Sequence, residues 1–274
     1  MNVFYEALRT ESLPVFCINV SGSERGSRRW GVMLQRWKAV VESALREHRI
    51  RLPPLTRWEA TTPADLPDKP TAPTDLPDTL DPPAPSRFAH YLSPGQRSCA
   101  WSHRRLWEEI AKLPTPSAPR CALILEDDVV FRKGWLDELI HAPEDAEMLL
   151  LNASEEVMPA GAWVRARDQC MAAAYMLTSA AAVELLRLSG EVVHASDWTT
   201  QLLQRRGRSW TLFPWLAIQD GADSFLQPGG TPDADLAKVK RLLGRYVGED
   251  AFRELYMWEE EEGPQIEGEK STKM

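Results

Sequence analysis

The stretch Cys121–Phe131, CALILEDDVVF, decides the predicted fold because it places three consecutive carboxylates between two apolar segments. Its first five residues have the length and composition of a strand buried on both faces, which is typical of a parallel sheet. In an open parallel sheet, ligands bind in the crevice beyond the carboxyl ends of the strands. Glu126, Asp127 and Asp128 are therefore expected at a ligand-binding edge.

Two interpretations of these three acids stay open on the residues alone. Burying an unpaired carboxylate costs several kcal/mol, and a divalent cation would remove that cost. Oxygen ligands on a short turn suit Mg²⁺ or Mn²⁺. The alternative is a solvent-exposed acidic turn that merely precedes a helix at GWLDELI, residues 134–140, because acids also favour a helix N-terminus.

Apolar runs of strand length alternate with segments of helical period along the rest of the chain. This alternation is typical of α/β proteins. Further strands are predicted at PVFCINV (14–20), TRWEA (56–60), EMLLLN (147–152), MAAAYMLT (171–178) and within WTLFPWLAIQ (210–219). Helices are predicted where Trp30, Leu34, Trp37, Val41 and Leu45 recur, at SAAAVELLRLSG (179–190), and from Asp197 onward.

The helix with the clearest start signal lies in LSPGQRSCAWSHRRLWEEIAKL, residues 92–113. Ser93 suits the N-cap, Pro94 suits the first helical position, and Gln96 stands where a capping box requires it. His103 points inward, because one face is shared by Cys99, His103, Leu106, Ile110 and Leu113. A buried histidine that is hydrogen-bonded to the backbone is the ordinary alternative to a role in a site.

The bulk composition limits the class of protein. A chain of 274 residues with 43% hydrophobic and 26% charged residues can bury the core of one large domain. The net charge of −8 argues against nucleic-acid binding, although segment 21–57 carries nine Lys and Arg against three Glu. That segment would either meet an anionic ligand or form a solvated helix surface.

Neither a membrane span nor an export signal is predicted. No apolar run approaches the roughly 18 residues that a spanning helix needs, and the N-terminus lacks a basic start followed by a long apolar stretch. The four cysteines are widely spaced, and no pair has metal-ligand spacing, which favours reduced core thiols. We therefore expect a cytoplasmic protein.

A proline-rich segment interrupts the alternating pattern. Eight of the 23 residues from Pro63 to Pro85 are proline, which excludes helix interiors and central strands, so residues 63–85 are predicted to be a loop insertion. The predicted domain spans residues 1–230. Residues 231–274 are expected to form one amphipathic helix and an acidic, disordered tail that contains EEEE at 259–262.

The order of these features resembles glycosyltransferase family 25, which contains lipooligosaccharide galactosyltransferases of bacteria and the galactosyltransferase domains that modify collagen. The two most specific blocks are LSPGQRSCAWSHRRLWEEI (92–110) and ALILEDDVVF (122–131). The weaker matches are VFCINV (15–20) with RRW (28–30), RWEA (57–60), AAAYMLTSAAAVELL (172–186), SDW (196–198), and FPWLAIQ (213–219) with Ser224. Together the blocks run in the family's order from about Pro14 to Ser224.

The resemblance implies an α/β fold of the GT-A-like type, with a Rossmann-type sheet flanked by helices that binds a nucleotide sugar. The acidic motif would hold Mn²⁺ or Mg²⁺ on the donor diphosphate. Asp128 would be the most direct metal ligand, while Asp127 and Glu126 would coordinate through water or orient the sugar. Gln219 corresponds to a family glutamine on the metal side; its ordinary alternative is a polar residue at a strand end.

The resemblance also places residues around the donor and the acceptor. Donor contacts would come from Asn19, Val20, Ser21, Arg28 or Arg29, Ser102 and His103. Asp197 would act as the general base that takes the proton of the acceptor hydroxyl. An aspartate before WTTQLL is also a good helix N-cap, and that alternative stays open. The turn after the first strand, NVSGSERGSRRW, departs from the family's Asn-Leu-Asp-Arg and has Ser21 in place of the acid.

The resemblance therefore implies a metal-dependent glycosyltransferase that moves galactose from a UDP-sugar to a glycan or lipid-linked glycan. The acceptor would lie in the cytoplasm or at the inner face of the membrane, where the protein would associate peripherally, without a transmembrane segment. A non-catalytic nucleotide-sugar-binding or partner-binding member of the fold is the first alternative. A metal-dependent phosphoesterase is the second, although the chain lacks a paired His-Asp set and a phosphate-binding glycine loop.

Overall fold

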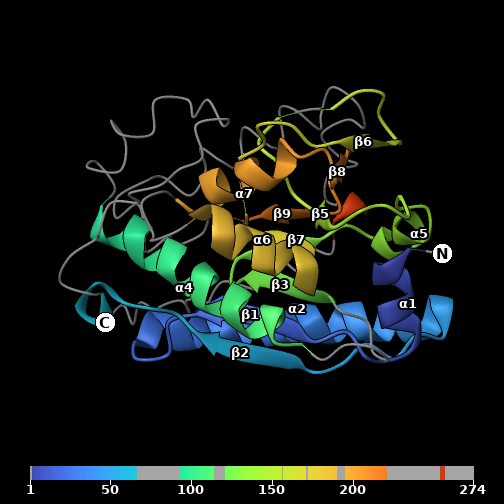
Figure 1. Ribbon diagram of the computed structural model, residues 1–274. Coiled ribbons are helices and arrows are strands. Elements are labelled where there is room, and N and C mark those ends of the chain that lie inside the picture. The colour runs from blue at the N-terminus through green and yellow to red at the C-terminus, as the bar shows by residue number, and fades with distance from the viewer. Residues whose placement is uncertain are drawn as a thin grey trace, which may run out of the picture.

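The protein is described by a computed structural model over residues 2–66, 93–113, 121–155, 157–170, 172–189, 195–220 and 254–256. Its centre is a seven-stranded sheet in the order β2-β1-β3-β7-β5-β8-β6 (Figure 1). The strands are β1 (Val15–Asn19), β2 (Leu55–Glu59), β3 (Cys121–Glu126), β5 (Met148–Leu150), β6 (Trp163–Arg165), β7 (Ala174–Thr178) and β8 (Ser209–Leu212). A second, two-stranded sheet pairs β4 (Val129–Phe131) with β9 (Ala217–Gln219).

Five strands of the central sheet run in one direction. β1 pairs in parallel with β2 and β3, and β5 pairs in parallel with β8. β7 runs antiparallel between β3 and β5, and β6 runs antiparallel at the edge. The carboxyl ends of β1, β2, β3, β5 and β8 consequently meet at one edge, as in Rossmann-type sheets. The predicted α/β fold class is confirmed.

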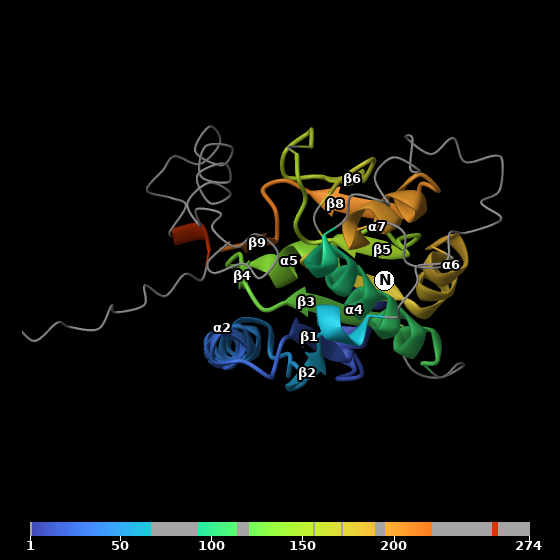
Figure 2. The same ribbon diagram turned by 90° about the vertical axis from the view of Figure 1, so that its left-hand side faces the viewer.

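Helices cover both faces of the sheet. The helices are α1 (Val3–Arg9), α2 (Glu24–His48), α4 (Pro94–Ala111), α5 (Trp135–Ile140), α6 (Ser179–Ser189) and α7 (Ser196–Gln204), with a 3₁₀ turn at Pro63–Asp65. One core cluster joins the sheet to α1, α2 and α5, and the other joins it to α4, α6 and α7. Figure 2 shows α2 on one side of the stacked strands and α6 on the other.

Side-chain alternation along β3 links these two cores to the acidic residues. Leu123 and Leu125 belong to the core that contains α2, whereas Ala122 and Ile124 belong to the core that contains α4. Because successive side chains of a strand point to opposite faces, Glu126 follows Ile124 toward α4. Asn19 at the end of β1 follows Val15 and Cys17 on the α2 side in the same way.

The start of α4 forms for the predicted reason. The Ser93 side chain accepts a hydrogen bond from the Gln96 backbone, and the Gln96 side chain accepts one from the Ser93 backbone, with Pro94 in the first turn. This reciprocal capping box fixes where the helix begins. The position of His103 three turns later on the helix is thereby set by a local signal.

The apolar residues of α2 do not all face the core. Leu34 and Leu45 are 42% and 50% exposed, although both are part of the repeating apolar pattern. The buried side of the helix is formed by Met33, Trp37, Val40 and Ala44. The pattern therefore predicted the helix correctly but not its buried face, because α2 carries more apolar residues than a single stripe holds.

Several elements were not predicted. They are α1, β4 and β6; β9 lies within the strands predicted at 210–219, but its pairing with β4 in a separate sheet was not predicted. Tyr256 is fully buried and pairs with Arg132 beside that small sheet. Some predicted segments lie outside the described residues: most of the proline-rich loop (67–85), Gly190, Ser224, and 231–253 with 257–274. The domain boundary at residue 230 therefore stays a prediction. The four cysteines are unpaired, as expected.

Gly26 allows α2 to start directly against the end of β1. A Cβ built at Gly26 would lie 1.7 Å from the Val20 carbonyl oxygen, whereas one built at Gly31 meets nothing within 4 Å. The Gly26 carbonyl also accepts a hydrogen bond from Asn19 Nδ2 at 2.9 Å. A side chain at position 26 would therefore push the helix away from the strand.

We expect Gly26→Ala to lower the free energy of unfolding by about 3 kcal/mol, because it overpacks a closed contact. Gly31→Ala on the same helix is the matched control, and it should stabilise by up to about 1 kcal/mol through helix propensity. Urea denaturation of both variants measures the difference. Equal stability of the two would show that the turn after β1 adapts freely.

Candidate active site

The three acids lie at the carboxyl edge of the sheet and are largely buried. Glu126 ends β3, and Asp127 and Asp128 form the turn into β4. Their side chains are 20%, 9% and 8% exposed. The helix at GWLDELI exists as α5, but it begins at Trp135, after β4. The interpretation as a solvent-exposed turn before a helix is therefore wrong.

A cavity of about 380 Å³ opens beside this turn. It is bounded by the end of β1, the start of α2, the segment after β2, and α4. Its lining residues include Asn19, Val20, Arg29, Thr61, Cys99, Ser102, Glu126, Asp127, Asp128 and Gln219. Ser21, His103 and Asp197 are not among the lining residues. The structure thus brings together eight of the eleven residues predicted for the site and places three behind or beside them.

Arg29 provides the positive charge that contacts both aspartates. Its Nη2 lies 2.5 Å from Asp127 Oδ1 and 3.2 Å from Asp128 Oδ2. Asp127 Oδ2 also accepts a hydrogen bond from Asn19 Nδ2 at 2.5 Å, and Asn19 Oδ1 accepts one from Arg57 Nε at 2.8 Å. Of the two candidate arginines, Arg28 and Arg29, the second is therefore the one that reaches the acids.

Burial dominates the protonation of the two aspartates. It raises the pKa of Asp128 to about 7 even though the neighbouring Arg29 lowers it, and Glu126 adds a further upward effect. The pKa of Asp127 is also raised by burial, against the opposing effects of Arg29 and Asn19. The ionised turn is thus costly to the fold, as expected where several carboxylates share a dry site.

Glu126 has a different environment because it points toward α4. His103 Nε2 lies 3.1 Å from Glu126 Oε1, and Gln219 Nε2 donates to Glu126 Oε2 at 3.1 Å. Burial alone would raise the pKa of Glu126, but its contacts with His103 and Cys99 and the charge of Arg29 together outweigh burial, and the pKa is lowered. Glu126 is therefore held as a carboxylate while Asp128 resists ionisation.

His103 belongs to a chain of side-chain hydrogen bonds. Trp107 Nε1 donates to the Tyr175 hydroxyl at 2.8 Å, and that hydroxyl lies 2.9 Å from His103 Nδ1. Every group is satisfied if Tyr175 donates to Nδ1 and Nε2–H donates to Glu126. The alternative of a histidine bonded to the backbone is wrong, since both its ring nitrogens have side-chain partners.

We expect Tyr175→Phe to destabilise the fold by about 2 kcal/mol, because it leaves His103 Nδ1 and Trp107 Nε1 buried without their partner. Tyr256→Phe is the matched control, since that buried hydroxyl donates to the Trp215 carbonyl at 2.9 Å, remote from α4. It should cost about 1 kcal/mol. Thermal unfolding measures the loss of stability in both variants. A smaller loss for Tyr175→Phe than for Tyr256→Phe would refute the hydrogen-bond chain.

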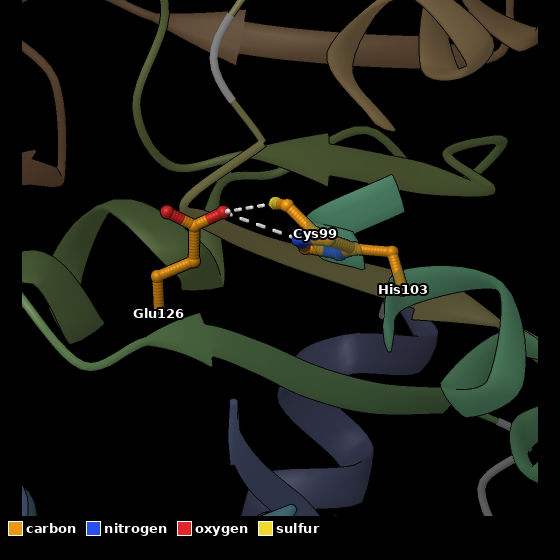
Figure 3. A group of neighbouring side chains, drawn as sticks. All are labelled: Cys99, His103 and Glu126. Carbon is orange, nitrogen blue, oxygen red and sulfur yellow. Dashed lines mark hydrogen bonds and ion pairs between the residues drawn. The ribbon is translucent and has the colours of Figure 1, made fainter. Parts of the chain in front are cut away.

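Cys99 was not predicted as a site residue, although it lies one helical turn before His103 on the predicted face. Its Sγ lies 3.7 Å from Glu126 Oε1, and Figure 3 shows both α4 side chains directed at that carboxylate. The three ligand atoms of Cys99, His103 and Glu126 lie within 4.8 Å of one another. Burial and Glu126 raise the pKa of the Cys99 thiol well above its usual value, so it stays protonated.

The donor set at the turn fits a hard divalent cation. Carboxylate oxygens of Glu126 and Asp128 converge on Gln219, whose Nε2 donates to Glu126 at 3.1 Å and lies 3.3 Å from both Asp128 oxygens. Turning the amide over would present its oxygen to the same place. Gln219 reaches this position because Val129, next to Asp128, pairs with it in the small sheet. Such an oxygen-rich set suits Mg²⁺ or Mn²⁺.

Asp197 lies in the first turn of α7, next to α4. The N-cap of α7 is Ala195, and no side chain caps this helix, so the alternative in which Asp197 is the N-cap is wrong. Its Oδ1 accepts from the Trp198 backbone at 2.9 Å. The adjacent Ser196 hydroxyl lies 3.9 Å from Cys99 Sγ, and the charge of Asp197 contributes to the raised pKa of Cys99.

Ser21 and Ser102 support the cavity wall through backbone contacts. The Ser21 backbone donates to Glu59 Oε1 at 2.9 Å, which ties the turn after β1 to β2. The Ser102 hydroxyl accepts from the Thr61 backbone at 2.8 Å and donates to the Ser98 carbonyl. These bonds hold two walls of the cavity together, and Ser102 also lines it.

One comparison with known proteins gives a match. Residues 79–200 match the family model described as glycosyltransferase family 25 (LPS biosynthesis protein). The matched segment contains α4, the acidic turn and Asp197, whereas Asn19, Arg29 and Gln219 lie outside it. The match covers less than half of the chain; it supports the family predicted from the sequence and glycosyltransferase activity in general. No curated protein matches the chain.

Proposed function

We propose that this chain, which matches glycosyltransferase family 25 over residues 79–200, transfers galactose from UDP-galactose to a hydroxyl group of a glycan with Mn²⁺ or Mg²⁺ as cofactor. The observation that carries the proposal is the buried acidic turn. Glu126, Asp127 and Asp128 lie at the carboxyl edge of the sheet beside a cavity of about 380 Å³. Arg29 neutralises only part of this turn, and a bound cation would offset the rest of the cost of burying three acids together.

The donor would bind between β1 and the acidic turn. Asn19 and Val20 line the cavity at the end of β1, where a nucleotide fits a Rossmann-type sheet. Arg29 is within reach of the diphosphate, since it already contacts the acids that would hold the cation. Glu126, Asp128 and Gln219 would hold that cation. When bound, it would stabilise the charge that develops on the departing UDP.

The acceptor would approach from the side of α4 and α7. Its hydroxyl oxygen attacks the anomeric carbon, the bond from that carbon to the diphosphate breaks, and the hydroxyl proton passes to the Asp197 carboxylate. Asp197 suits this role because it follows Ser196, whose hydroxyl lies 3.9 Å from the Sγ of Cys99, and Cys99 lines the cavity. Cys99 and His103 would position Glu126 for the same reaction.

The acceptor class follows from the family description, which names lipopolysaccharide biosynthesis. A growing lipid-linked glycan presented at the inner face of the membrane would meet a cytoplasmic enzyme there. Within the described residues, no helix is long and apolar enough to span a membrane. Peripheral association with the membrane is part of the proposal and is measured by flotation with vesicles.

The proposal is tested by incubating the protein with UDP-galactose and other UDP-sugars in the presence of Mn²⁺ or Mg²⁺. We expect slow release of UDP by hydrolysis, fastest with UDP-galactose and abolished by EDTA. Release of inorganic phosphate from p-nitrophenyl phosphate would instead favour a phosphoesterase. Thermal stabilisation by UDP without turnover of any sugar would favour a non-catalytic binding protein. Either result would contradict the proposal.

A further inference from the structure

Arg29 contacts Asp128, which the proposed function assigns to a cation, and the adjacent Asp127. One nitrogen, Nη2, lies 2.5 Å from Asp127 and 3.2 Å from Asp128, and the Arg29 side chain is 11% exposed. The guanidinium thus neutralises part of the acidic turn from within the protein. A surface arginine would be too hydrated and mobile to do so.

A divalent cation and this guanidinium compete for the same negative charge. Two positive groups that both approach Asp128 Oδ2 repel each other, and the repulsion is strong because water is largely excluded from the turn. The neighbouring acid Asp220 does not relieve the competition, since its Oδ2 is paired with Arg36 Nη2 at 2.5 Å. Arg29 in its present position therefore opposes cation binding.

A bound diphosphate would remove the repulsion between Arg29 and the cation. Arg29 lines the cavity, and a guanidinium can bind phosphate oxygens with two parallel hydrogen bonds. Once Arg29 donates to the diphosphate, the oxygens of Asp127 and Asp128 become available to the cation. The cation in turn binds phosphate oxygens, as Mg²⁺ and Mn²⁺ usually do.

We propose that Arg29 is a built-in counter-ion that keeps the acidic turn from binding a divalent cation tightly until a nucleoside diphosphate draws the guanidinium away. This inference rests on the proposed function, because it takes the acidic turn as the metal site and the cavity as the donor site. It goes further in making donor and metal binding mutually dependent. By linkage, UDP raises the affinity for the metal by the same factor by which the metal raises the affinity for UDP.

The test measures the binding of Mn²⁺ alone and of Mn²⁺ with UDP by calorimetry, for wild type and Arg29→Gln. For wild type we expect weak binding of Mn²⁺ alone and an increase on the order of tenfold with UDP. Arg29→Gln removes the charge but keeps a hydrogen-bonding side chain. It should bind free Mn²⁺ about tenfold more tightly than wild type, bind UDP more weakly, and lose most of the coupling.

Arg36→Gln is the matched control. Arg36 lies on the same helix, its side chain is 13% exposed, and it pairs with a buried aspartate outside the acidic turn. We expect it to leave UDP affinity unchanged and to alter Mn²⁺ affinity much less than Arg29→Gln does. Arg29→Lys retains the charge and should bind free Mn²⁺ as weakly as wild type.

The outcomes separate this inference from the proposed function. If wild type binds neither UDP nor Mn²⁺, the proposed function fails. If wild type binds both but without coupling, or if Arg29→Gln binds free Mn²⁺ no more tightly than wild type, the counter-ion role of Arg29 is refuted while the proposed function stands. If Arg29→Gln does not fold, Arg29→Met provides the same comparison of free Mn²⁺ binding, because direct contact of the cation with phosphate gives wild type some coupling in any case.

Discussion

Asp128→Asn is expected to abolish metal-dependent binding of the donor and to reduce UDP release by at least about 100-fold. The amide removes the charge that a cation needs and leaves the shape of the turn unchanged. Calorimetry with UDP and Mn²⁺, and the rate of UDP release, measure the two effects. Unchanged affinity for both ligands would remove Asp128 from the proposed site.

The same substitution should stabilise the protein at pH 8. The pKa of Asp128 is raised from 3.8 to about 7, principally by burial. A raised carboxyl pKa gives stability that is complete below the unfolded value and is lost as the pH rises through the folded value. Wild type should therefore lose stability between about pH 4 and pH 7, whereas Asp128→Asn should not.

We expect the advantage of Asp128→Asn in thermal unfolding to grow from pH 4 to pH 8, reaching on the order of 2 kcal/mol in the absence of added metal. Asp137→Asn, at a side chain that is 64% exposed in α5, is the control and should show no such trend. A variant that is less stable than wild type at pH 8 would show that the charge of Asp128 is needed to hold Arg29.

Asp197→Asn is expected to lower kcat by about 10²- to 10⁴-fold with little change in KM for the donor, because the acceptor proton would lose its base. The fold should be unaffected, since asparagine can still accept the bond from the Trp198 backbone. Steady-state kinetics with donor and acceptor, together with UDP binding, separate the two effects.

Asp168→Asn is the matched control for Asp197. Asp168 is an exposed acid that contacts the same helix through Arg205, at 2.8 Å, and its φ of 52° is one that asparagine tolerates. It should retain wild-type kcat. If Asp197→Asn retained kcat within about threefold, another group would have to take the acceptor proton.

The sequence predicted those parts of the fold that depend on local signals. The burial of CALIL, the capping box at Ser93 and the apolar run at residues 14–20 each act within a few neighbouring residues, and each element formed where expected. The three-residue strands β4 and β6 lack enough residues to show a period. The buried face of α2 also could not be predicted, because its pattern offers more than one apolar stripe.

From the residues alone, only the part of the site that is contiguous in the sequence could be predicted, whereas the family resemblance supplied Asn19, Arg29, Ser102 and Gln219. Glu126, Asp127 and Asp128 stand together at a strand end, so their shared edge followed from the sequence. The contact between His103 and Tyr175 did not, because it depends on the register that pairs Ile124 of β3 with Tyr175 of β7. The choice of Arg29 over Arg28 likewise depends on the angle at which α2 leaves β1.

The alternation of side chains at the end of β3 gives the two sides of the cavity wall different helical supports, and Gln219 contacts the acids of both sides. Glu126 is held by α4 through His103 and Cys99, whereas Asp127 and Asp128 are held by Arg29 of α2. Changes in the connection between β1 and α2 can thus reshape the side that faces a nucleotide without disturbing the side built by α4. Substitutions between β1 and α2 can therefore change which donor is bound while the contact between His103 and Glu126 is kept.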